Sequence, residues 1–204
     1  MTATTVRFTE EMEGHIALGE IDPRTGAAAG RERGAHFKFH LTIETIDIER
    51  FVSEPEHLGH ATGWIDSDEL GGRLAVEAGD FNLFVDTDEP GVKEMRYVLW
   101  FSDSVGHPLT MTGTKYVADD RGLDMWSDTT TLFCRVHQGH VRREDDAPVV
   151  GAGMLRIRPI SFARQLTTFR ASGGSVRDRL QGISRFAALF VGRLRDVYGP
   201  RGAR

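Results

Sequence analysis

A close series of short alternating segments is the feature that most constrains how this chain can fold. About nine strand-like runs follow one another between Phe8 and Arg158, before the first clearly helical stretch. In the clearest run, residues 36–44, large apolar side chains alternate with polar ones, which is typical of a strand with one face in a core. Because the connections are too short for parallel crossovers, the series predicts a mostly antiparallel sheet.

Glycines inside the strand-like runs favour a closed barrel over a flat sandwich. They permit the bulges and sharp bends that closure requires, and they are Gly14, Gly63, Gly113, Gly151 and Gly153. We therefore predict a mainly β fold: an antiparallel barrel of about 8–10 strands, lipocalin-like in general shape. The barrel is predicted to cover residues 1–160, and residues 161–204 are predicted to form a helical segment packed on it within a single domain.

The patterns also give approximate element bounds. Strands are predicted at residues 8–18, 36–44, 60–66, 73–78, 81–86, 95–101, 109–117, 129–137 and 149–158. Residues 46–52 are predicted to form a helical turn. The stretch from Glu20 to Gly34 contains one proline and three glycines and is interpreted as a long loop.

The C-terminal part changes to a helical period. Ser161 is expected to cap a short helix through Phe169, and Ser175 a longer one that stops before Gly199. The apolar stripe of the longer helix must be covered, most simply by the barrel, or else by a partner subunit or a membrane surface.

Charge is distributed unevenly along the chain. Residues 1–155 carry 14 Lys and Arg against 28 Asp and Glu, whereas residues 156–204 carry 11 Arg against two Asp. A basic tail could bind phosphates, anionic lipid or nucleic acid, or could pack on the acidic body, which is the simpler interpretation. A nucleic-acid role is disfavoured because the tail lacks lysine and has few aromatic residues for stacking.

The chain lacks the sequence motifs of several classes of enzyme and binding protein. Gly151-Ala152-Gly153 does not continue into a dinucleotide fingerprint, and no phosphate-binding loop or hydrolase nucleophile elbow occurs. The histidine pairs of the sequence lack the further ligands of a metal site, so no metal and no cofactor is predicted. With a single cysteine, no signal peptide and no long apolar run, we expect a cytoplasmic protein.

Lys115 is the strongest candidate for chemistry. In the predicted strand 109–117 it shares a face with apolar residues, so its ammonium group should point inward. A buried lysine needs a carboxylate partner, and Asp124 or Asp128 could supply one. The pair would either anchor a loop or act as an acid–base or ligand-binding group.

Three other residues that could carry a function each have a structural interpretation. Asn82 lies between large apolar neighbours, where its amide would satisfy the backbone or face a cavity. Asp128 at a strand entry is typical of an Asx-turn. Cys134 has no neighbouring histidine and is interpreted as an inert core thiol.

Ordered motifs across the chain resemble a known module. They are Phe8-x-Glu10-x-Met12-x-Gly14, Gly79-x-Phe81-Asn82-Leu83-Phe84, Met95-x-Tyr97, Gly113-x-Lys115-x-Val117, Asp124-x-Trp126-x-Asp128-Thr129-Thr130-Thr131-Leu132 and Phe162-Ala163-Arg164-Gln165-Leu166-Thr167-Thr168-Phe169. Over residues 8–198 the chain is similar to the accessory region of multidomain cholesterol-oxidase-like proteins. In those proteins the region accompanies a flavin-dependent glucose-methanol-choline oxidoreductase part and an α/β-hydrolase part.

The resemblance implies a class of ligand and of partner enzymes but no catalytic activity of this chain, because the flavin and hydrolase motifs have no matching positions here. It implies a sterol-like or lipid-like small molecule, a flavin oxidoreductase or α/β-hydrolase partner, and Tyr97 and Trp126 as ligand-binding candidates beside Asn82, Lys115 and Asp128. We therefore expect a non-enzymatic binding or accessory module.

Two alternatives remain open. One is a cofactor-independent isomerase or lyase that uses Lys115 with Asp124 or Asp128. The other is a module that docks a protein or a membrane through the basic C-terminal helix. The sequence does not say whether the barrel interior is filled or hollow.

Overall fold

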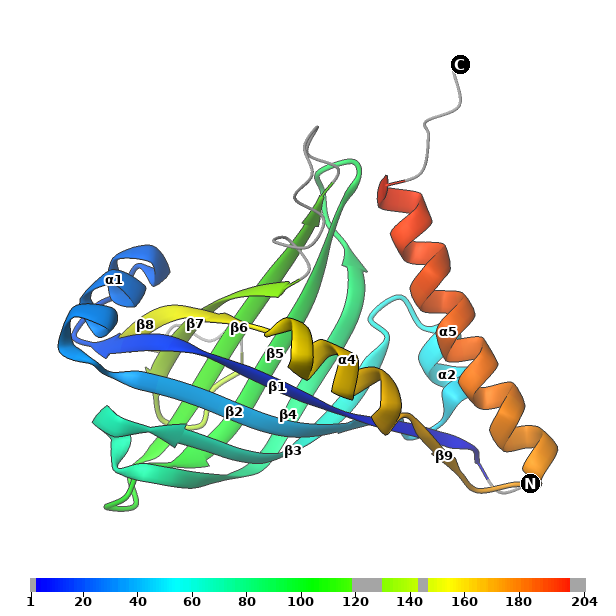
Figure 1. The fold of residues 1–204 in the computed structure, drawn as a ribbon, viewed down its shortest axis with the longest axis horizontal. Helices are drawn as coiled ribbons and strands as arrows, with labels where there is room; N and C mark the ends of the chain where they lie inside the picture. Colours follow the sequence, from blue (N-terminus) through cyan, green and yellow to red (C-terminus); the bar gives the residue numbers. More distant parts are fainter. Residues whose placement is uncertain (1–2, 119–129, 143–146, 199–204) are drawn as a thin grey trace.

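The protein forms an eight-stranded antiparallel barrel with a long C-terminal helix across one end (Figure 1). The computed structural model describes residues 3–118, 130–142 and 147–198. The strands are β1 Thr5–Leu18, β2 His36–Glu44, β3 Leu58–Ser67, β4 Gly72–Asp86, β5 Val92–Ser102, β6 Pro108–Ala118, β7 Thr131–Gln138, β8 Val149–Arg156 and β9 Arg170–Ser172. The helices are α1 Pro23–Arg33, α2 Ile48–Ser53, α4 Pro159–Thr168 and α5 Val176–Tyr198, with a 3₁₀ turn at Asp68–Leu70. The predicted fold class is confirmed.

Strand β1 closes the barrel. Strands β2 to β8 pair in sequence order, and β1 joins the two ends of that series. It pairs with β2 over residues 7–15 and with β8 only over residues 13–18, so the first half of β1 has no barrel strand on its second edge. Helix α4 lies along that half, where the Thr9 amide donates a hydrogen bond of 2.9 Å to Thr168 Oγ1. Strand β9 pairs with residues 5–7 and completes the edge.

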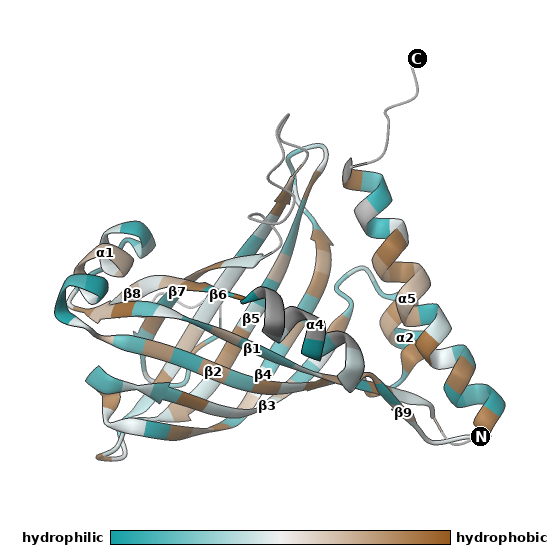
Figure 2. Cartoon of the chain, viewed as in Figure 1, coloured by the Kyte–Doolittle hydropathy of each residue, from teal (hydrophilic) through white to brown (hydrophobic). Residues whose placement is uncertain are grey.

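The inward-facing apolar side chains of the alternating strands fill most of the barrel interior. In β2 the apolar residues of the predicted run are buried and the polar residues between them are not, with the predicted bounds. Figure 2 shows the same alternation of hydrophobic and hydrophilic residues along the strands. The largest fully buried side chains include Phe37, Phe39, Phe101, Met12, Leu41 and Ile65. Such a core is close-packed, so this part of the barrel is not a channel.

The stretch predicted as a loop contains helix α1, so that interpretation was wrong. Asp22 caps the helix by accepting hydrogen bonds from the amides of Arg24 and Thr25, and a proline starts its first turn. Gly26 serves packing: a Cβ atom there would lie 2.0 Å from the carbonyl oxygen of Ala152 in β8. Glycine is therefore required there for the close approach of helix and sheet.

Two other predicted details change. Residues 73–78 and 81–86 belong to one long strand, β4, because Gly79 continues the pairing with β5 and makes no turn. Helix α4 begins after Arg158 without a side-chain cap, while the Ser161 hydroxyl donates to Glu11 Oε1 at 3.3 Å.

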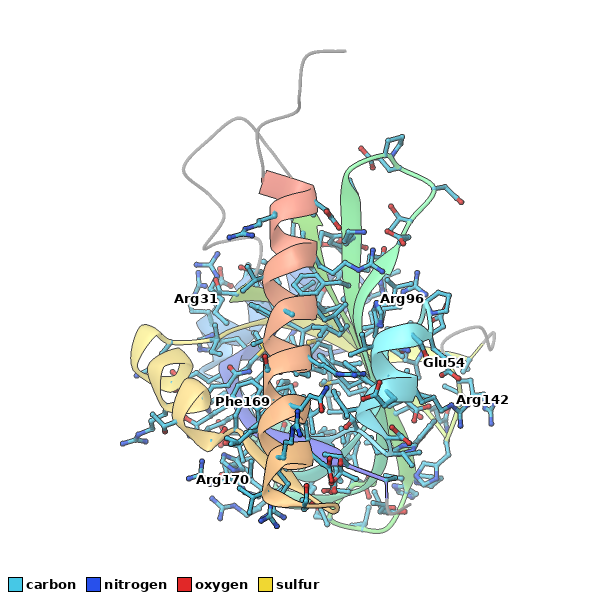
Figure 3. All side chains as sticks on the ribbon, turned by 90° about the vertical axis from the view of Figure 1, so that its right-hand side faces the viewer. Arg31, Glu54, Arg96, Arg142, Phe169 and Arg170 are labelled. Atoms are coloured by element: carbon cyan, nitrogen blue, oxygen red, sulfur yellow. The ribbon has the colours of Figure 1, made fainter. Side chains whose placement is uncertain are left out.

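Helix α5 begins as predicted. The Ser175 hydroxyl accepts a hydrogen bond from the Asp178 amide, and the Asp178 carboxylate accepts one from the Ser175 amide. This reciprocal pair is a capping box. Viewed from its end of the barrel, α5 runs across the front between α4 and α2 (Figure 3). An ion pair of Arg185 with Glu49 ties it to α2.

Candidate functional site

A cavity of about 350 Å³ lies between the end of the barrel and helix α5. Strands β1, β4 and β5 form one wall, and α4, Phe169 and α5 form the other. The described lining residues are Phe8, Glu10, Phe81, Leu83, Met95, Tyr97, Gln165, Phe169, Ile183, Phe186, Ala187, Phe190 and Val191. All of them except Glu10, Tyr97 and Gln165 are apolar, so the cavity is a hydrophobic site with a small polar region.

Aromatic rings join the barrel to the helices around the cavity. The ring of Phe8 stacks on that of Phe169 with their centroids 4.9 Å apart, and both contact Phe186 of α5, at 5.6 and 5.3 Å. Figure 3 shows Phe169 between α4 and α5. Such ring pairs contribute about 0.5–1.5 kcal/mol each beyond their buried area, so they help to hold α5 over the barrel.

Two of the polar lining residues, Glu10 and Tyr97, belong to a buried triad with Lys115 that spans the barrel lumen. Lys115 Nζ of β6 donates to Glu10 Oε1 of β1 at 2.6 Å, and the Tyr97 hydroxyl of β5 donates to Glu10 Oε2 at 2.7 Å. The ammonium group also lies 5.2 Å from the centre of the Tyr97 ring. The side chains of Lys115 and Glu10 are only 3% and 4% exposed. The three groups satisfy one another, as buried polar groups must.

The alternation of β1 places Glu10 inside. Val6, Phe8 and Met12 are buried on the same face, and Glu10 occupies the inward position between the last two. Sequence reasoning missed Glu10 as the partner of Lys115, because Asp124 and Asp128 lie closer to Lys115 along the chain. The available signal was a glutamate at an inward position of a half-buried strand.

Burial controls the ionisation of the neighbouring groups. Desolvation, and then the negative charge of Glu10, raise the pKa of the Tyr97 hydroxyl well above its usual range, so it stays protonated and able to donate. Burial also strongly raises the pKa of the Cys134 thiol. Cys134 is thus an inert core thiol, as predicted.

A second polar cluster anchors the far part of α5. The imidazole Nδ1 of His57 bonds to the carbonyl oxygen of Phe51 at 2.7 Å, and its Nε2 lies 3.2 Å from a guanidinium nitrogen of Arg193. Arg193 also pairs with Asp86 at 3.7 Å, and Asp86 pairs with Lys93. The basic tail therefore does pack partly on the acidic body.

The predicted site residues have different outcomes. Lys115 does point inward and Tyr97 does line the cavity. Lys115 is paired with Glu10, a partner not foreseen, while Asp124, Trp126 and Asp128 lie outside the described residues. Asn82 Nδ2 donates to the carbonyl oxygen of Glu56 at 2.9 Å, so its amide satisfies a backbone group, and Asn82 is not among the described lining residues of this cavity.

A scan against protein-family models and searches of the curated proteins and the solved structures gave no significant match. Within the described residues, no three His, Cys, Asp or Glu side chains gather to hold a metal ion. No helix in that part of the chain is long and apolar enough to cross a bilayer.

Replacing Lys115 by methionine should destabilise the fold by about 3–5 kcal/mol, because it leaves the Glu10 carboxylate buried without its cation. Urea unfolding followed by circular dichroism measures the loss. In the double variant Glu10→Gln, Lys115→Met, which leaves no unpaired charge, most of the stability should return. A Lys115→Met protein as stable as the wild type would contradict the assigned pairing.

The polar cluster of His57 and Arg193 that holds α5 should make the free energy of unfolding depend on pH. Desolvation lowers the pKa of His57 below its ordinary 6.5, and the charges of Arg193 and Lys93 act in the same direction, against Asp86 and the Phe51 carbonyl. The unfolded chain then binds the proton more readily, so this stability is fully present above pH 6.5 and is lost as pH falls through that value towards the folded pKa.

Thermal unfolding between about pH 7 and about pH 5 should show this loss, and the variant His57→Asn should show a smaller loss over the same window. Asparagine is suitable because residue 57 has a positive φ of 40°, which asparagine tolerates. Equal pH slopes for the two proteins would exclude His57 as the titrating group.

Proposed function

We propose that this protein binds a hydrophobic, lipid-like small molecule in the cavity between the barrel and α5, and that it acts as a binding or accessory module and not as an enzyme. The observation that carries the proposal is the lining of the cavity, in which ten of the thirteen described residues are apolar. Small-molecule sites of proteins are concave, mostly apolar and supplied with a few placed polar groups.

The size and position of the cavity support a small ligand. A volume of about 350 Å³ falls at the lower end of the range of about 300–1,000 Å³ that is typical of ligand pockets. The wall formed by α5 is held by side-chain contacts and not by sheet hydrogen bonds, so it can move without breaking the barrel. Entry past α5 is therefore the least costly route.

The resemblance to the accessory region of cholesterol-oxidase-like proteins supports the same class of ligand. On this basis the module would bind or present a sterol-like or lipid-like molecule for a flavin oxidoreductase or α/β-hydrolase partner. That association is part of the proposal, and the oxidative or hydrolytic chemistry would belong to the partner.

An acid–base enzyme is the less supported alternative. Both oxygens of Glu10 already accept hydrogen bonds from Lys115 and Tyr97, and Lys115 is not among the described lining residues. A catalytic base must reach the proton that it removes, and the ammonium group of Lys115 is already paired with Glu10.

A matched pair of substitutions on α5 tests binding in the cavity. Ala187 and Ala188 are both exposed, but only Ala187 is among the described residues that line the cavity. The neutral apolar fluorophore N-phenyl-1-naphthylamine should bind the wild type saturably. Ala187→Phe should weaken binding about tenfold or more, a loss of about 1.4 kcal/mol, because the ring fills the site. Ala188→Phe should bind as the wild type does.

Absence of saturable binding to the wild type would contradict the proposal, as would equal weakening by the two variants. Thermal unfolding of both variants serves as the control that the fold is intact.

A second candidate function, docking on an anionic membrane, is favoured by the exposed face of α5. Val176, Leu180 and Val191 are 63%, 65% and 45% exposed, and their spacing of four and eleven residues places them on one side of the helix. Val191 also lines the cavity, so the exposed stripe continues to its edge.

Arginines border the stripe. Arg177, Arg179 and Arg195 lie on α5, and none has an ion-pair partner in the described part of the chain. A helix with an apolar stripe and arginine borders suits the surface of anionic lipid, to which each basic residue adds about 1 kcal/mol. Docking on such a membrane would bring the cavity edge close to lipid.

Vesicle co-sedimentation tests this second function. The protein should bind vesicles that contain phosphatidylserine more strongly than pure phosphatidylcholine, and salt should weaken the binding. Leu180→Glu should reduce binding several-fold, whereas Gln181→Glu adds the same charge at the adjacent exposed position and should reduce it less. Wild-type protein that stays in the supernatant, or equal effects of the two substitutions, would exclude the stripe as a lipid contact.

A further inference from the structure

We propose that the cavity selects an alcohol, an apolar molecule whose hydroxyl group donates a hydrogen bond to the carbonyl oxygen of Gln165. The inference rests on the proposed function, because it concerns the same cavity, and it adds the chemical class of the ligand's polar end.

The starting point is an unsatisfied acceptor. Gln165 comes from α4 and lines the cavity, and its Oε1 is buried without a hydrogen-bond partner in the described structure. Buried polar atoms nearly always have a partner, and an orphan of this kind is expected to be completed by something that is not in the chain. Because Oε1 has almost no accessible surface in this structure, a ligand in the cavity reaches it after the Gln165 side chain turns its amide towards the cavity. The ligand can then complete it only by donating a proton.

The other polar groups of the cavity are acceptors as well. The Tyr97 hydroxyl uses its proton on Glu10, so its oxygen has only lone pairs left. Each oxygen of Glu10 accepts one hydrogen bond and retains capacity for another. A rotation of the Gln165 amide would exchange its oxygen and nitrogen, but Glu10 and Tyr97 would still offer acceptors alone.

Charge disfavours a fatty acid. The described lining residues include no Lys, Arg or His, and Lys115 is committed to Glu10. A carboxylate ligand would bring a second negative charge towards Glu10 without a cation to neutralise it. An ether with the same alkyl chain as the fatty acid avoids this repulsion, but it has no O–H group to donate a hydrogen bond to Gln165. A hydroxyl group meets both conditions, and a site built to hydrogen-bond a hydroxyl discriminates against analogues that lack it.

Competition among three ligands with ten-carbon chains tests the inference. N-phenyl-1-naphthylamine is first bound to the wild-type protein and then displaced by 1-decanol, 1-methoxydecane or decanoate. We expect 1-decanol to displace the probe at a concentration about tenfold lower than either of the others. In Gln165→Met, or in Gln165→Leu if the first variant is unstable, 1-decanol and 1-methoxydecane should displace it at similar concentrations.

The outcomes separate the two proposals. If the probe binds the wild type but the three competitors are equal, or decanoate is the best, the alcohol inference is wrong and the hydrophobic binding function stands. A preference for 1-decanol that survives in the Gln165 variant would also overturn the assignment to this residue. If the probe does not bind at all, both the function and the inference fail.

Discussion

The buried ion pair of Glu10 with Lys115 is the interaction on which the rest of this structure depends. It joins β1, the strand that closes the barrel, to β6 on another part of the wall, and it does so inside the lumen. Neither charge is tolerable there alone, since an unpaired buried ion costs several kcal/mol. On one side of the pair the barrel is filled by large apolar side chains, and on the other Glu10 and Tyr97 contribute to the polar part of the cavity lining, together with Gln165 of α4.

This division explains how one barrel can have both a solid core and a binding site. Phenylalanine, leucine and methionine side chains fill the barrel away from α5 and give it stability, as in any close-packed interior. At the end under α5, one edge of β1 has no barrel strand, and helices α4 and α5 cover that end with side-chain contacts. Helices that are held by rings and by the His57–Arg193 contact can adapt to a ligand more easily than a strand of the sheet.

Local patterns were sufficient for much of the fold. The complete alternation of residues 36–44 predicted β2 with its bounds, and Ser175 with Asp178 marks the start of α5 by its own hydrogen bonds. The inward direction of Lys115 followed from strand periodicity alone, because the period of two leaves only two faces. These features are encoded within one strand or one helical turn.

The features that local patterns did not predict depend on distant neighbours. Gly26 resembles a helix breaker in sequence, yet it permits α1 to touch the backbone of Ala152. Gly79 resembles a turn residue, but a Cβ atom there would lie 2.7 Å from the Leu99 side chain of the adjacent strand. The partner of Lys115 is 105 residues away, on a strand whose position is fixed only when the barrel closes.

The location of the bound molecule tests the account most directly. Protein labelled with ¹³C in its methionine methyl groups would be mixed with N-phenyl-1-naphthylamine, and nuclear Overhauser contacts would be recorded. Met95 lines the cavity, whereas Met12 and Met111 are fully buried in the filled core. Contacts to Met95 alone among these three are the predicted result, and contacts to Met111 without Met95 would contradict a cavity under α5.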